Sequence, residues 1–139
     1  MRPIIPFCIS LSLLTAGSAI AADTPFLFDA LRNKAYRQSW DGLMAKVKMA
    51  SSVPEWLEQF SKTYDGVASQ AVSLTIEGKS YELFFVCKPT DCAGHRFDVL
   101  FETASKRAFG ALGGKDSPPG FFGDPAPALQ EALAKATKG

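Results

Sequence analysis

The sequence predicts an α+β domain, with a central antiparallel β-sheet flanked by helices and a protruding loop between two strands. Two apolar runs, residues 81–86 and 97–101, lie on either side of a short segment that contains two cysteines. Apolar side chains recur at helical spacing before this region and again near the end of the chain. Strands grouped between two helical stretches favour an α+β arrangement over alternating α/β units.

Length and composition narrow the class of protein. The chain has 139 residues, of which 47% are hydrophobic and 21% are charged, values typical of one globular domain. Its formal net charge of +1 lacks the basic excess expected of a nucleic-acid-binding protein. We therefore expect a single domain, which we place at residues 22–139.

Residues 1–21 have the form of a secretory signal peptide. Arg2 is their only charged residue, and an apolar stretch follows it from Ile4 to Ala16. The small-x-small sequence Ala19-Ile20-Ala21 is typical of a signal-peptidase site and predicts cleavage before Ala22. Because the apolar stretch is too short for a membrane-spanning helix, we expect an exported protein without a membrane span.

Cysteine usage then predicts one disulfide. Cys8 lies within the leader and would be lost with it, which leaves Cys87 and Cys92 in an oxidising compartment. Pro89 and Asp91 between them are turn formers, so the chain can bring the two sulfurs together. We expect a Cys87–Cys92 disulfide, which closes a short ring made of residues 87–92.

Two helices are predicted before the sheet. Thr24-Pro25 has the pattern of a helix start, and the helix should run through about Lys48, with Gly42 as the candidate break point. Residues 52–55 have capping-box spacing and should open a second, short helix that ends at Asp65-Gly66. The apolar positions of these helices are Tyr36, Trp40, Leu43, Val47, Trp56, Leu57 and Phe60.

Four strands and a last helix complete the predicted domain. The strands are expected at residues 71–76, 81–86, 97–103 and 108–112, with turns at 77–79 and at Lys106-Arg107. Residues 113–123 are rich in glycine and proline and predict a loop. Asp124-Pro125 should cap the last helix, whose apolar face is made of Leu129, Ala132, Leu133 and Ala136.

Several residues have both a structural and a functional interpretation. The cysteine pair is either a structural staple or part of a binding loop, and its four intervening residues disfavour a catalytic dithiol, which usually has two. His95, the only histidine, fits a surface or strand-edge position. It lies just outside the ring, so it could also contact whatever partner the ring binds. The large aromatic residues are more typical of a core than of a sugar-binding platform: Trp40, Trp56, Phe84, Phe85, Phe97 and Phe101. The acidic residues of the strands should lie on the solvated face of the sheet: Glu77, Glu82, Asp98 and Glu102.

Signatures of an enzyme are weak. A single histidine gives no metal cluster of the usual spacing, and neither a nucleophile elbow nor a nucleotide-binding glycine motif occurs. We expect no catalytic residue, no metal and no cofactor. Three classes remain: a protein inhibitor, a cell-wall or glycan-binding module, and a redox protein of the same compartment.

The cysteine segment resembles the Ivy family, periplasmic inhibitors of vertebrate c-type lysozyme. That family carries a Cys-Lys-Pro-His-Asp-Cys loop between two central strands, and five of these six positions match here, with Thr90 in place of the histidine. Leu43, Pro54-Glu55-Trp56 and Tyr81 are also similar to the family. The resemblance covers roughly residues 36–112.

The resemblance implies a function for this loop. In that family the ring enters the substrate cleft of lysozyme, where its histidine engages the two catalytic carboxylates. By this likeness the target-binding residues are Lys88, Pro89, Thr90 and Asp91, and the partner is a c-type lysozyme or a lytic transglycosylase of the cell. The resemblance also implies a periplasmic location and leaves a homodimer open. A glycan-binding module without inhibitory activity is the alternative.

The chemistry of the ring suits insertion into an acidic cleft. Lys88 offers ammonium donors and Thr90 one hydroxyl, whereas Asp91 is expected to accept backbone N–H groups and hold the turn. Closing a ring of this size removes about 2 kcal/mol of chain entropy before binding. Because Thr90 is shorter than histidine and uncharged, we expect weaker binding to c-type lysozyme than the family motif would give.

Overall fold

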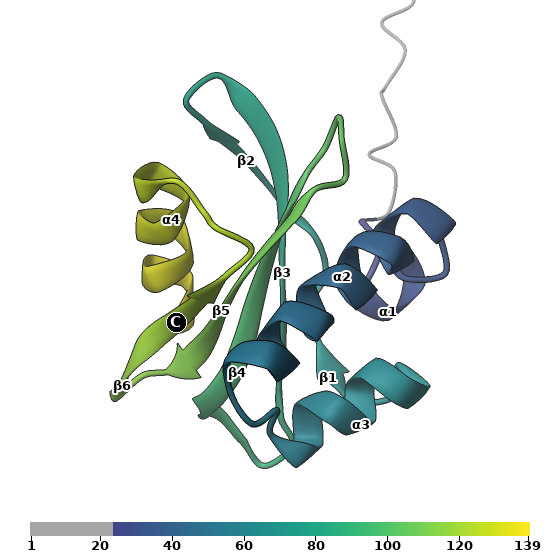
Figure 1. The fold of residues 1–139 in the computed structure, drawn as a ribbon, viewed down its shortest axis with the longest axis vertical. Coiled ribbons are helices and arrows are strands. Elements are labelled where there is room, and N and C mark those ends of the chain that lie inside the picture. Colours follow the sequence, from purple (N-terminus) through teal and green to yellow (C-terminus); the bar gives the residue numbers. More distant parts are fainter. Residues whose placement is uncertain (1–23) are drawn as a thin grey trace, which may run out of the picture.

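The computed structural model describes residues 24–139 as a six-stranded antiparallel sheet with helices on both faces (Figure 1). The strand order is β1-β3-β4-β5-β6, and β2 also pairs with β3 beside β1. This confirms the predicted fold class. The predicted leader, residues 1–21, and its cleavage site lie outside the described residues. The elements are α1 Leu27–Ala30, α2 Lys34–Ala50, α3 Glu55–Thr63, β1 Val67–Ala68, β2 Val72–Ile76, β3 Lys79–Lys88, β4 Asp91–Glu102, β5 Ala108–Gly114, β6 Ser117–Phe122 and α4 Pro127–Thr137.

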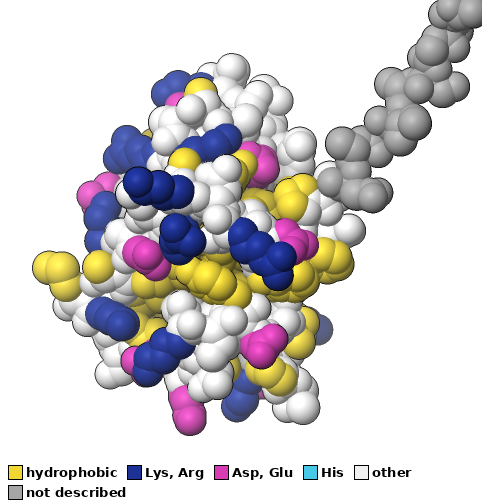
Figure 2. All heavy atoms as spheres, turned by 90° about the vertical axis from the view of Figure 1, so that its right-hand side faces the viewer, with side chains coloured by type: hydrophobic (Ala, Val, Ile, Leu, Met, Phe, Trp, Pro, Cys, Tyr) yellow, Lys and Arg dark blue, Asp and Glu magenta, His cyan; other side chains and the backbone are white. Residues whose placement is uncertain are grey.

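Helices α1, α2 and α3 cover one face of the sheet, to its right in Figure 1. Their apolar side chains meet those of alternate positions on β3 and β4 in the larger core, which includes Trp40, Leu57, Phe60, Phe84, Phe97 and Phe101. The aromatic rings pack edge to face, as Trp40 does with both Phe60 and Phe97. Figure 2 shows the surface on this side, where acidic and basic side chains are interspersed around a band of hydrophobic ones.

The first predicted helix is two helices, and its break is not at Gly42. Thr24 and Pro25 lie outside α1, which begins after Phe26, so the predicted cap is wrong. The chain turns at residues 31–33, and the Asn33 side chain then caps α2 by accepting a hydrogen bond from the Ala35 amide at 2.9 Å. Gly42 lies inside α2, and a β-carbon added there would have nothing within 4 Å, so it costs helix propensity without breaking the helix.

Helix α3 forms where predicted, but without the capping box. Pro54 occupies the N-cap, and no side chain caps the helix there. Its end agrees with the prediction, because Tyr64 takes a left-handed conformation with φ of 57° just before Asp65-Gly66.

The central strands are longer than the sequence pattern predicted. β3 and β4 extend as far as Lys88 and Asp91, so their hairpin continues to within two residues of its turn. A two-residue strand, β1, was not predicted; it pairs with β3 at Val67↔Cys87 and Ala68↔Val86. Between β1 and β2, Ser69 continues the ladder, since its hydroxyl accepts a hydrogen bond from the Phe85 amide at 2.8 Å.

The predicted loop at residues 113–123 is mostly a strand. β5 continues to Gly114, and β6 returns beside it with Ala111↔Phe121 and Leu112↔Gly120 as partners. β6 lies at the edge of the sheet, where proline is tolerated because only one side of the strand needs backbone hydrogen bonds. Pro118 and Pro119 therefore mark an edge strand here, and reading them as a loop was wrong.

Helix α4 covers the opposite face of the sheet. It begins at Pro127 after an Ala126 N-cap, so Asp124-Pro125 is not its cap; Asp124 has a φ of 55° in the preceding turn. Leu129, Leu133 and Thr137 form its buried stripe. The two leucines pack with Tyr81, Leu100 and Phe109 in a second, smaller core.

Candidate functional site

The predicted disulfide forms at the end of the β3–β4 hairpin. Cys87 and Cys92 are bonded, with their Cα atoms 4.8 Å apart. Lys88 and Asp91 face each other as the last pair of the hairpin, and Pro89 and Thr90 form the turn between them. The ring lies at the lower end of the sheet in Figure 1, next to α3. All four predicted binding residues, Lys88 to Asp91, are exposed there.

The turn holds Thr90 in an unusual conformation. Its φ of 74° lies in the left-handed region, which β-branched residues rarely adopt. A type II turn requires a positive φ at its third position, and proline is common at its second, as Pro89 is here. The tip therefore carries backbone strain at the position where this chain departs from the family loop.

Asp91 accepts a backbone N–H as predicted, but that of Gly94 beyond the ring and not one within the turn, and it has a second partner that was not predicted. Its Oδ1 accepts a hydrogen bond from the Gly94 amide at 3.1 Å. Its Oδ2 lies 2.8 Å from Nδ1 of His95, whose side chain is 53% exposed. The bond from His95, followed by that from Gly94, holds the pKa of the Asp91 carboxyl below its ordinary value. His95 is thus tied to the ring rather than merely adjacent to it.

Residues 92–95 form a bulge that is fixed by the neighbouring hairpin. The pairing shifts from Cys87↔Arg96 to Lys88↔Asp91, which leaves these four residues of β4 without partners on β3. The Lys115 amide donates to the Ala93 carbonyl at 2.8 Å. Gly114 approaches the Gly94 backbone so closely that an added β-carbon would lie 2.0 Å from its carbonyl oxygen. The β5–β6 hairpin therefore fixes the base of the ring from the side.

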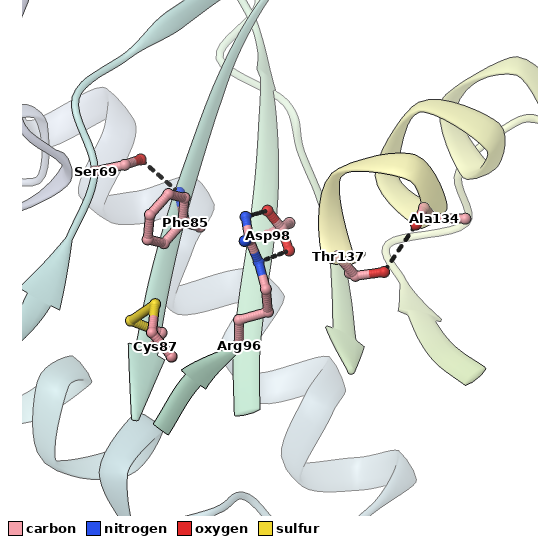
Figure 3. Close-up of polar contacts among 8 residues, drawn as sticks. Ser69, Phe85, Cys87, Arg96, Asp98, Ala134 and Thr137 are labelled. Carbon is pink, nitrogen blue, oxygen red and sulfur yellow. Dashed lines mark hydrogen bonds and ion pairs between the residues drawn. A yellow bond between two sulfur atoms is a disulfide. The ribbon is translucent and has the colours of Figure 1, made fainter. Parts of the chain in front are cut away.

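A buried ion pair supports the ring from the face that α4 covers (Figure 3). Arg96 pairs with Cys87 in the ladder, and its guanidinium donates to both carboxylate oxygens of Asp98 at 3.0 and 2.7 Å. The guanidinium carbon also lies 4.3 Å from the Phe85 ring centre. Burial raises the pKa of the Asp98 carboxyl, and the bonds from Arg96 oppose that rise.

Two of the predicted solvated acids are not on a solvated face. Asp98 is 0% exposed, so the prediction for it was wrong. Alternation along the strand places it toward α4, and it is tolerated there because Arg96 neutralises it. Glu82 is half-buried and accepts a hydrogen bond from the Tyr36 hydroxyl of α2 at 2.5 Å. Glu77 lies in the exposed β2–β3 turn, as expected.

A groove of about 530 Å³ lies between the ring and the start of α3. Its helix side is made of Pro54, Glu55, Trp56 and Gln59. Its ring side is made of Lys88, Pro89 and His95. We call it the α3–ring groove. Sequence reasoning missed it, because the two walls lie about thirty residues apart along the chain and nothing in the local pattern brings them together.

The remaining candidates take mostly structural roles. Cys87 is 1% exposed and Cys92 is half-buried, so only one sulfur of the bridge is partly open to solvent. Trp40, Phe84, Phe97 and Phe101 are buried in the core, as predicted, while Trp56 and Phe85 are half-buried. Within residues 24–139, no group of three or more His, Cys, Asp or Glu side chains could hold a metal ion. No helix in that range is long and apolar enough to cross a membrane.

Comparison with known proteins gives two matches. A family model described as "Inhibitor of vertebrate lysozyme (Ivy)" matches residues 35–139, which includes β6 and α4 as well as the stretch that carries the loop motif. The chain is also 34% identical over 106 residues to a Pseudomonas aeruginosa protein named "Inhibitor of vertebrate lysozyme". That alignment covers 72% of this chain and 65% of the relative, slightly less than two thirds of the relative's length.

Proposed function

This chain belongs to the Ivy family, and from that premise we propose that it inhibits lysozyme. The target is a c-type lysozyme or a related muramidase or lytic transglycosylase. The Cys87–Cys92 ring enters the active-site cleft of the target and blocks access of the glycan. The protein acts as an inhibitor and carries out no catalysis of its own.

The position of the ring is the observation that carries this proposal. The ring stands at the end of the longest hairpin of the sheet, with Lys88 to Asp91 exposed and both cysteines held at its base. A glycosidase cleft contains two carboxyl groups that flank the scissile bond. The Lys88 ammonium and the Thr90 hydroxyl are donors that such a pair accepts.

Rigidity of the ring lowers the cost of insertion. The disulfide, the bonds of Asp91 and the close contact of Gly114 fix the ring before the target arrives. A preorganised loop loses less conformational entropy on binding. The double variant Cys87→Ser, Cys92→Ser should keep the far-UV circular dichroism of the wild type but bind more weakly, by up to about thirtyfold for the 2 kcal/mol of loop closure. Unchanged affinity would remove rigidity from the mechanism.

Inhibition assays test the function directly. Purified protein should slow the lysis of bacterial cell walls by a c-type lysozyme, and Lys88→Ala should reduce its potency about tenfold or more. A lytic transglycosylase assayed in parallel identifies which enzyme is the better target. If the wild type slowed neither enzyme at micromolar concentration, the proposal would fail.

The glycan-binding alternative has less support. A glycan-binding module needs an exposed row of aromatic side chains, and four of the six candidate aromatics are buried in the core. The two that are half-buried, Trp56 and Phe85, lie on different faces of the sheet: Trp56 packs with the three-helix core, while Phe85 contacts Arg96 on the opposite face. We therefore favour inhibition.

Export is a further part of the proposal. We expect the leader to be removed before Ala22 and the mature protein to act in the periplasm. N-terminal sequencing of protein from a periplasmic extract should begin at Ala22. An intact Met1 in a cytoplasmic fraction would contradict the compartment. The homodimer that the resemblance leaves open stays a prediction, to be measured by light scattering.

A further inference from the structure

The ring alone is too small to form a stable interface. Specific protein–protein complexes bury about 800 Å² on each partner and use about 20 to 30 residues a side. The ring presents four exposed residues at a two-residue turn. If it enters the cleft of an enzyme, as proposed above, the surface that surrounds it must touch the rim of that cleft.

The α3–ring groove is the hollow that continues directly from the ring. Lys88 and Pro89 belong to both, and His95 joins them through its bond to Asp91. The opposite wall is the first turn of α3, which projects Glu55 and Trp56 toward the same space. A ring inserted into a cleft would therefore bring the lip of that cleft against this groove.

The two walls carry different charges. The ring wall has Lys88, whereas the helix wall has Glu55 and the neutral Gln59. Lysozyme is a basic protein with an acidic catalytic pair inside its cleft. The basic wall thus matches the interior of the cleft, and the acidic wall matches the basic surface outside it, which is the complementary arrangement that favours a specific encounter.

Trp56 adds a reason to expect a cation at the helix wall. It is half-buried, lines the groove, and follows Glu55 directly in the chain. Tryptophan is the aromatic side chain that attracts cations most strongly, and arginine is enriched among the residues that dominate binding energy at interfaces. A groove lined by both a carboxylate and an indole ring is a suitable site for a guanidinium or ammonium group.

We propose that the α3–ring groove is a second contact site, which binds a loop from the lip of the target's cleft through an arginine or lysine side chain held by Glu55 and Trp56. This inference rests on the proposed inhibition of lysozyme and adds a site to it. The ring supplies insertion into the cleft, and the groove supplies the area and the specificity for the surrounding surface.

Charge reversal in the groove tests the inference. Glu55→Lys should weaken binding to immobilised c-type lysozyme about tenfold or more in 50 mM salt, measured by biolayer interferometry. The difference from the wild type should shrink in 500 mM salt, because salt screens the repulsion. Glu55 is exposed but lies in the first turn of α3, so this variant should lower the melting temperature by only a few degrees, through the lost interaction with the helix dipole, and should remain folded. Trp56→Leu should weaken binding severalfold.

Glu131→Lys is the matched control, because it makes the same change in net charge on exposed surface of α4, across the sheet. It should change the affinity less than twofold. Equal effects of the two reversals would overturn the inference, since net charge alone would then explain the loss. If Lys88→Ala weakens binding while Glu55→Lys does not, insertion of the ring stands and the second site fails. A wild type that does not bind would remove both proposals.

Discussion

Thr90 offers the sharpest test of how the ring works. It occupies the position where the family loop has histidine, and its φ of 74° is unfavourable for a β-branched residue. Histidine and asparagine are both found more often in this conformation than threonine. Only histidine can also carry a positive charge toward two carboxylates. Thr90→His and Thr90→Asn, compared side by side, therefore separate the backbone effect from the charge effect.

The expected magnitudes differ between the two variants. A charge-assisted hydrogen bond contributes about 1.5–3 kcal/mol, against about 1 kcal/mol for a neutral one. Left-handed strain at a non-glycine residue costs about 1–3 kcal/mol, and either replacement relieves part of it in the free and the bound protein alike, so this relief changes affinity little. We expect Thr90→His to bind c-type lysozyme about ten- to a hundredfold more tightly than the wild type. Thr90→Asn should gain only a few fold.

Inhibition constants measured at fixed salt decide between these effects. The advantage of Thr90→His should be present at pH 6 and fall by pH 8.5, because it depends on a protonated imidazole. If Thr90→Asn matched Thr90→His at both pH values, the gain would come from the backbone alone. If neither variant differed from the wild type, the tip residue would not be an anchor, and Lys88 or the shape of the ring would carry the interaction.

Three further predictions concern the support of the ring. Asp98→Ala should lower the free energy of unfolding by about 3 kcal/mol or more, measured in urea, because it leaves a buried guanidinium unpaired; a loss below about 1 kcal/mol would contradict this. Because the pKa of Asp91 is lowered, its bonds are present above the ordinary value of about 3.9 and are lost as the pH falls through the lowered pKa. The amide resonance of Gly94 should therefore titrate below pH 3.9 and should not do so in Asp91→Asn. Gly114→Ala should reduce inhibition of lysozyme, because its β-carbon collides with the Gly94 carbonyl. Gly120→Ala should not, because its β-carbon meets only ordinary contacts. Equal inhibition by the two variants would refute the idea that the β5–β6 hairpin fixes the ring.

The sequence correctly predicted those helices and strands whose position follows from the spacing of their apolar residues. The two apolar runs around the ring became β3 and β4, and the apolar stretches near Trp56 and Leu129 became α3 and α4 within a few residues. It failed where tertiary position overrides local preference. Pro118 and Pro119 stop a central strand but not an edge strand, and only the whole sheet shows that β6 is at an edge. In the same way, Gly42 does not break α2, because it lies on the solvent-exposed side of a helix whose other side is held by packing.

The sequence predicted the disulfide of the candidate site, but not the contacts that hold the ring in place. The disulfide and the backbone N–H that Asp91 accepts from Gly94 involve residues that are neighbours in the chain. The contact of Gly114 with Gly94, the pairing of Arg96 with Asp98 and the groove beside α3 depend on strand register and helix packing. Arg96 and Asp98 do carry one local signal, because opposite charges two positions apart on a strand lie on the same face.

The support of the ring explains how its tip can change without loss of the fold. A strained residue such as Thr90 persists only where the surrounding structure determines its conformation. Here the disulfide, the Asp91 bonds, the β5–β6 contact and the Arg96–Asp98 pair all act on the base of the ring, and none of them uses the side chain at position 90. Substitution at the tip should therefore alter affinity and choice of target without loss of the fold, and stability should change only by part of the about 1–3 kcal/mol of strain at Thr90. We therefore expect this fold to accept different residues at position 90 while the base of the ring keeps its structure.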